Sequence, residues 1–150
     1  MTKKILILLF FFGSFFMQAQ TLVWKTNMSD AIAISNEQRK PMLILFTASG
    51  VPENLQNEIF KTPDFAVWSR DNVILVKLDL SDSEATDGDK EQNIKLKNAF
   101  GVEDLPEVCF AMASIRKNKT TFSALGKIAY KTGGAKAWIS ESNAILHPSE

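Results

Sequence analysis

The chain has 150 residues, with 17 basic and 17 acidic side chains and a formal net charge of zero. This balance gives no indication of a nucleic-acid-binding protein, which would typically carry an excess of basic residues. Cys109 is the only cysteine, so no disulfide can form within the chain. A pair of thiols that cycles between oxidised and reduced forms is excluded for the same reason.

The first twenty residues have the pattern of an export signal. Lys3 and Lys4 precede an apolar core over residues 5–16, and a small-residue region ends at Ala19 or Gln20. This core is shorter than the roughly 20 residues that span a bilayer, and no cysteine follows it to carry a lipid anchor. We therefore expect a cleaved signal peptide over 1–20 and a periplasmic or secreted protein with no stable membrane anchor. An uncleaved N-terminal anchor is the alternative.

Cleavage would leave residues 21–150, with 15 basic and 17 acidic side chains, as one domain long enough to bury a core. Residues 21–24 predict a short edge strand, and a helix is expected from Met28 to Arg39 with Asn27 as its N-cap. The stripe that this helix is expected to bury consists of Met28, Ala31, Ile32 and Ser35.

The apolar run from Met42 to Thr47 predicts a buried strand, followed by a polar turn and a helix that starts near Pro52. A second helix is expected to begin at Pro63, capped by Thr62, and to bury Phe65 and Trp68. Residues 73–80 are almost continuously apolar, which predicts a central strand covered on both faces.

A polar loop is expected over Ser81–Asp89, and its four acidic residues match no EF-hand spacing, so no metal site is expected there. Beyond it we expect a helix over 90–100, strands over 107–113 and 121–126 joined by a hairpin turn, and a helix over 133–146. The helix over 90–100 is expected to bury Leu96, Ala99 and Phe100. The helix over 133–146 is expected to bury Ala135, Trp138, Ile139, Ser142 and Ile145.

The segment from Pro41 to Phe60, PMLILFTASGVPENLQNEIF, resembles the active-site segment of the thioredoxin superfamily. The similarity is to secreted thioredoxin-like proteins in which the active strand continues as FTGSxWCxxC. Residues 46–51 align with this pattern one for one. The two cysteines do not align, because this chain has Pro52 and Leu55 in their places.

A second resemblance lies at residues 99–108, AFGVEDLPEV, which are similar to the loop that carries a cis-proline opposite the two cysteines. The resemblance implies that the bond before Pro106 is cis. It covers nearly all of residues 21–150 and implies an α/β thioredoxin-like fold, in which helices flank a central mixed β-sheet.

The resemblance also implies which chemistry is missing. Pro52 has no ionisable group, although it suits the first turn of a helix, and Leu55 is apolar. The family's buried acid would lie at Phe46, or at Leu45, and neither side chain ionises. No catalytic residue, cofactor or metal is therefore expected at this site.

Cys109 is a possible reactive thiol, but a lone cysteine in an apolar strand is usually a buried and inert side chain. The only histidine, His147, lies near the C-terminus, where we expect it to be exposed. A catalytic Cys–His pair and a histidine-based metal site are therefore not expected.

These observations predict a thioredoxin-like protein that has lost its redox-active dithiol and binds a protein or an extended peptide. The resemblance places the binding groove at Gly50, Val51, Pro52, Leu105 and Pro106, where a peptide would add as a short strand. One alternative is a thiol-disulfide oxidoreductase that uses Cys109 alone. Another is a structural subunit of an envelope assembly.

Overall fold

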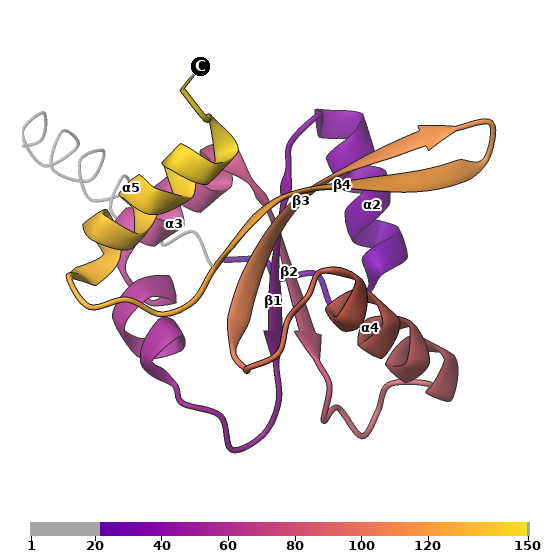
Figure 1. Ribbon diagram of the computed structural model, residues 1–150, viewed down its shortest axis with the longest axis horizontal. Coiled ribbons are helices and arrows are strands. Elements are labelled where there is room, and N and C mark those ends of the chain that lie inside the picture. Colours follow the sequence, from indigo (N-terminus) through magenta and orange to yellow (C-terminus); the bar gives the residue numbers. More distant parts are fainter. Residues whose placement is uncertain (1–21, 150) are drawn as a thin grey trace, which may run out of the picture.

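The computed structural model describes residues 22–149, so the predicted signal peptide lies outside the described residues. Its centre is a four-stranded mixed sheet with the strand order β2-β1-β3-β4 (Figure 1). The strands are β1 (Met42–Thr47), β2 (Ile74–Asp79), β3 (Glu107–Arg116) and β4 (Lys119–Ile128). β1 is parallel to β2 and antiparallel to β3, and β3 is antiparallel to β4. The predicted mixed sheet is confirmed.

Helices cover both faces of this sheet (Figure 1). One face carries α2 (Met28–Gln38) and α4 (Asp87–Ala99), and the other carries the π-helix η2 (Leu55–Phe60), α3 (Pro63–Asn72) and α5 (Gly134–Leu146). No helix among residues 22–149 is long and apolar enough to cross a membrane.

Each layer of helices encloses its own core. The α2-side core consists of Met28, Ala31, Ile32, Met42, Ile44, Phe46, Ile74, Val76, Leu78, Val102, Cys109, Ala111 and Ala113. The α5-side core consists of Leu43, Leu45, Leu55, Ile59, Phe60, Phe65, Trp68, Val73, Leu75, Val108, Phe110, Ile128 and Trp138. Alternate residues of β1 enter the two cores, which explains why this strand is continuously apolar.

The first helix follows its prediction closely. The side chain of Asn27 accepts a hydrogen bond from the backbone N–H of Asp30 at 3.2 Å, as an N-cap does. The four residues predicted to face inward are all buried. The helix ends at Gln38 because Arg39 adopts a left-handed conformation, with φ of 53°.

The prediction that the strand after α3 is central is wrong, because β2 is an edge strand. The predicted strand over residues 21–24 is replaced by a single parallel bridge between Lys25 and Val76. Lys25 donates to the carbonyl of Leu75 and accepts from the N–H of Lys77, both at 2.8 Å. β2 is apolar because helices cover both of its faces and this short segment covers part of its outer edge.

The helix predicted from Pro52 begins later than expected. Its first backbone bond runs from the N–H of Asn57 to the carbonyl of Glu53 at 2.9 Å, so Pro52 lies before the first helical turn. A wider bond, from the N–H of Lys61 to the carbonyl of Gln56, marks the π-helical turn. The restart at Pro63 is confirmed, because Thr62 accepts from the N–H of Phe65 at 3.2 Å.

Helix α4 begins three residues before its prediction. Thr86 caps it by accepting from the N–H of Asp89 at 3.1 Å, and acidic residues in a first turn stabilise a helix N-terminus. Ala99, predicted to face inward, is exposed, while Asn93 is buried. Leu96 and Phe100 pack against the α2-side core as expected, and Gly101, with φ of 70°, ends the helix.

The hairpin of β3 and β4 is longer than predicted, with ten residues in each strand. Lys117 and Asn118 form a two-residue turn with φ of 50° and 62°, which are the values of a type I′ hairpin turn. This turn projects beyond the helices (Figure 1). Val108 and Phe110 face one core and Cys109 faces the other, as alternate residues of a strand do.

Trp138 of α5 organises the α5-side core. Its side chain is fully buried, its Nε1–H donates to the carbonyl of Ala129 at 3.1 Å, and its ring lies 5.8 to 6.4 Å from four others. These rings belong to Phe60, Phe65, Trp68 and Phe110. The predicted inward stripe of α5 is present, with Ala135 and Ser142 buried and Ile139 and Ile145 partly buried.

We expect Trp138→Ala to lower the free energy of unfolding by about 3–5 kcal/mol, because it removes a buried indole and leaves a cavity among aromatic rings. Urea unfolding followed by circular dichroism measures this change. Val67→Ala, on an exposed position of α3, serves as a control and should change the value by less than about 0.5 kcal/mol. Equal effects from the two substitutions would contradict this description of the core.

Candidate functional site

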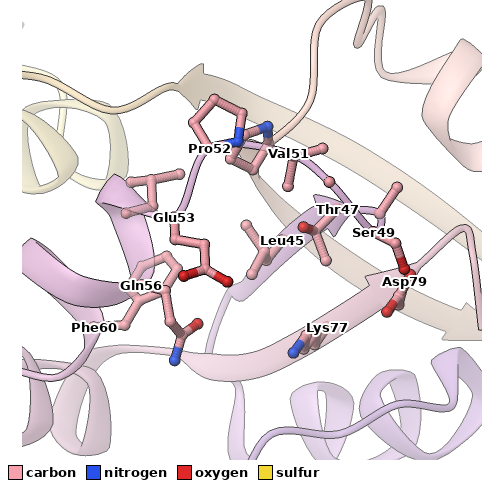
Figure 2. A pocket seen from close by; sticks show the side chains of 14 residues that line it. Leu45, Thr47, Ser49, Val51, Pro52, Glu53, Gln56, Phe60, Lys77 and Asp79 are labelled. Carbon is pink, nitrogen blue, oxygen red and sulfur yellow. The ribbon is translucent and has the colours of Figure 1, made fainter.

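A pocket of about 200 Å³ opens at the carboxyl end of β1, beside the loop that follows this strand (Figure 2). Pro106 also lines it. It contains the stretch on which the resemblance depends. The lining residues are Leu45, Thr47, Ala48, Ser49, Gly50, Val51, Pro52, Glu53, Leu55, Gln56, Phe60, Lys77, Asp79 and Pro106.

Hydrogen bonds between neighbouring strand ends hold the loop after β1. The N–H of Leu80 donates to the carbonyl of Thr47 at 2.8 Å. The hydroxyl of Ser81 accepts from the N–H of Ser49 at 2.7 Å and donates to a carboxylate oxygen of Asp79 at 2.6 Å. These contacts fix the first half of the loop to β2, so the rim of the pocket has a defined position.

Most of the predicted groove residues lie together. Gly50, Val51, Pro52 and Pro106 all line the pocket, and the Leu105–Pro106 bond is cis, as the resemblance implied. The side chain of Leu105 does not line it, because it packs against the α2-side core. Leu105 is therefore the one predicted groove residue that is not among the lining residues of the pocket.

The two positions that the resemblance assigns to cysteines differ in their surroundings. Pro52 is exposed on the rim, whereas Leu55 is 2% exposed and belongs to the α5-side core. Neither residue can lose a proton or attack a disulfide. The pocket wall at these positions consists of carbon atoms where the family would have sulfur.

The structure also decides between the two positions considered for the buried acid. Leu45 lines the pocket and shares the α5-side core with Leu55, while Phe46 faces the α2-side core. A proton acceptor for position 55 would therefore have to lie at Leu45. That side chain is apolar and 4% exposed, so the floor of the pocket lacks an ionisable group there.

The pocket also contains four polar residues that were not predicted to belong to it, namely Glu53, Gln56, Lys77 and Asp79. Glu53 and Gln56 point from the loop and η2 toward the ends of β1 and β2, where Lys77 and Asp79 lie (Figure 2). Two charged residues at alternate positions of the apolar run VILVKLDL were the available signal. Alternate residues share one face of a strand, so these two had to point to the same side.

Lys77 gives the pocket a positive group. It is paired in register with Leu45, so its stem lies over the apolar floor. Within residues 22–149 its ammonium group makes no ion pair, although Glu53 and Asp79 line the same pocket. A ligand with a carboxylate could reach this group, and ligand amides could donate to either carboxylate.

Cys109 lies on the other side of the sheet from the pocket. It is 1% exposed within the α2-side core. The pKa of its thiol is raised to about 12, mainly by burial and also by the charge of Glu107, while the charge of Lys127 opposes the shift. Since the thiolate is the reactive form, this thiol is in a poor position for chemistry.

His147 follows the end of α5 and is exposed. Its N–H donates to the carbonyl of Asn143 at 2.8 Å, which ends the helix. The part of the chain that the structure describes holds no group of three or more His, Cys, Asp or Glu side chains that could bind a metal ion.

We predict that the folded protein loses stability as the pH rises above about 9. The pKa of Cys109 is raised from its ordinary 9.0 to about 12, so between these values the folded state keeps a proton that the unfolded state has lost. This group should lower the free energy of unfolding by up to about 1.4 kcal/mol per pH unit in that window. Urea unfolding at several pH values measures the effect.

Cys109→Ala is the control, because it removes the titrating group and should show a shallower loss over the same range. Iodoacetamide at pH 8 should leave the folded wild type unmodified and label it once urea unfolds it. Rapid labelling of the folded protein would contradict the buried position of this thiol.

No family model matches the chain. The thioredoxin-related protein DsbJ of Chlamydia pneumoniae is 23% identical over 136 residues, which cover 85% of this chain and 38% of that protein. The chain thus spans well under half the length of this curated relative.

Two solved structures share the fold. The structure described as DsbH oxidoreductase has a TM-score of 0.71 at 21% identity and covers 87% of this chain and 88% of its own. A thioredoxin from Thermus thermophilus has a TM-score of 0.61 at 12% identity, over 85% of this chain and 89% of its own. The α/β fold expected from the sequence is confirmed.

Proposed function

We propose that this chain, which has a thioredoxin-like fold, is an exported and non-catalytic module that binds a protein or an extended peptide. The supporting observation is the pocket at the end of β1. It keeps an open groove beside a cis-proline, yet carries Pro52 and Leu55 in place of thiols. The shape for binding is present without the nucleophile for redox chemistry.

An extended peptide would lie across Gly50, Val51, Pro52 and Pro106 and pair with the backbone of Leu105. Peptides that add to a protein in this way gain affinity from backbone hydrogen bonds and specificity from pockets for alternate side chains. The space of about 200 Å³ beneath the groove suits one such side chain. Its apolar floor and Lys77 would favour a side chain with an aliphatic stem and a polar or acidic end.

The main rival is a thiol-disulfide oxidoreductase that works through Cys109. It draws support from the name of the structural neighbour DsbH oxidoreductase. Against it, the thiol lies on the opposite side of the sheet from the groove, is buried, and has a raised pKa. A substrate disulfide in the groove could not reach it without local unfolding.

A structural subunit of an envelope assembly is the second rival. In that role the groove would be empty, and substitutions on its rim would affect no ligand. The two experiments below separate all three functions, because the first tests catalysis and the second tests occupancy of the groove.

In the first, we expect the purified domain to reduce insulin with dithiothreitol no faster than dithiothreitol alone. The reason is that the pocket contains no thiol. Precipitation of the insulin B chain measures the rate, and Cys109→Ser should leave it unchanged. Catalysis by the wild type that Cys109→Ser abolishes would establish the oxidoreductase and refute our proposal.

In the second, random peptides displayed on phage are selected on the wild-type domain, and their affinities are measured by fluorescence anisotropy. Val51→Asp places a charge on the rim of the groove and should weaken peptides bound there at least tenfold. Val67→Asp, the same change on exposed α3, should not. Equal affinities for both variants would show that the groove is not the binding site.

A further inference from the structure

The outer edge of β4 is a second surface with the features of a binding site. β4 is the last strand of the sheet, and within residues 22–149 no other strand pairs with its outer side. Seven consecutive residues, 119–125, are exposed. The unpaired N–H and C=O groups of such an edge form a template for another extended segment.

The two edges of the sheet are protected to different degrees. β2 has six residues, carries Lys77 and Asp79, and is partly covered by the bridge to Lys25. β4 has ten residues, and those from Thr120 to Gly126 include no charged residue and no proline. Proteins usually protect an exposed edge with charges, prolines or a covering segment, and the middle of β4 lacks all three among the described residues.

The register shows which groups face outward. In an antiparallel ladder, residues alternately direct their backbone groups toward the partner strand and away from it. Counted from the two-residue turn, where Arg116 pairs with Lys119, the outward positions are Thr120, Phe122 and Ala124. Exposed apolar side chains accompany this edge, since Ile115 is 39% and Phe122 and Leu125 are each 37% exposed.

The basic residues around β4 indicate the charge of the segment that would bind there. The sequence has no acidic residue between Glu107 and Glu141. The basic residues in this interval are Arg116, Lys117, Lys119, Lys127, Lys131 and Lys136. Three of them lie at or beside the turn, at one end of the uncharged edge, and Lys127 lies just beyond its other end.

This distribution disfavours a second copy of the same chain. Pairing two β4 edges would bring two basic hairpins together, and the one acidic residue of each hairpin, Glu107, already forms an ion pair with Lys127 at 3.5 Å. We propose instead that the outer edge of β4 binds an extended acidic segment of another protein, which adds to the sheet as a fifth strand. Its backbone pairs with Thr120, Phe122 and Ala124, and its carboxylates lie near Arg116, Lys117 and Lys119.

The test uses the same phage-displayed random peptides. Those that bind the wild type are grouped by how their affinity changes in four variants. Phe122→Pro removes an outward N–H and places a ring on the edge, without removing a bond to β3. Lys117→Glu/Lys119→Glu reverses the charge and leaves the edge intact, so it tests the proposal even where Phe122→Pro fails to fold. Lys90→Glu/Lys97→Glu on α4 is the control for the charge reversal, because it changes the net charge by the same amount at another surface. Val51→Asp places a charge in the groove and is the control for peptides that bind there.

We expect a class of peptides rich in Asp and Glu whose affinity falls at least tenfold with Phe122→Pro and with the hairpin charge reversal. The α4 charge reversal and Val51→Asp should leave that class unchanged. In ¹⁵N spectra, its peptides should shift the amide signals of residues 120, 122 and 124 and protect them from hydrogen exchange.

Three results would overturn the proposal. One is the absence of any acidic class that responds to the hairpin variants. Another is that all selected peptides respond to Val51→Asp alone, which would support the groove and refute the edge. The third is a dimer in sedimentation experiments that Phe122→Pro dissociates, which would identify a second copy as the occupant.

Discussion

The structure depends on the burial of β1 on both faces. Five consecutive apolar residues from Met42 to Phe46 must be covered from both sides, so helices α2 and α4 pack on one face and η2, α3 and α5 on the other. Within the sheet, β1 pairs in parallel with β2 on one edge and antiparallel with β3 on the other. The loop after Thr47 then lies near the end of β2, which contributes Lys77 and Asp79 to the pocket, and near Pro106, which precedes β3.

Elements with strong local signals could be predicted from the sequence. Helix α2 has a cap at Asn27 and a clear buried stripe, and both were found as expected. The start of α4 was missed because the acidic residues of its first turn resemble a polar loop, although Thr86 caps them. β2 was placed at the centre of the sheet because a strand buried between helices is apolar even when it lies at an edge.

The site was only partly predictable, for a physical reason. The motif identifies Pro52 and Leu55. Lys77 lines the pocket because it pairs in register with Leu45. The register between two strands cannot be predicted from the sequence of either strand alone. The choice between Leu45 and Phe46 for the missing acid likewise depends on which face of the sheet carries η2. Both facts follow from tertiary structure rather than from spacing along the chain.

Pro52 lies outside the geometry that would activate a thiol. A thiolate needs the N–H groups and the dipole of a helix N-terminus, which would require the first turn to begin at residue 52. Here the carbonyl of Glu53, one residue later, accepts the first helical hydrogen bond, and a π-helical turn follows. A groove that only binds needs a stable rim and a floor, and the Ser49–Ser81–Asp79 contacts with Leu45 beneath supply these. The geometry thus departs from what thiol activation requires, and it is compatible with the peptide binding that we propose.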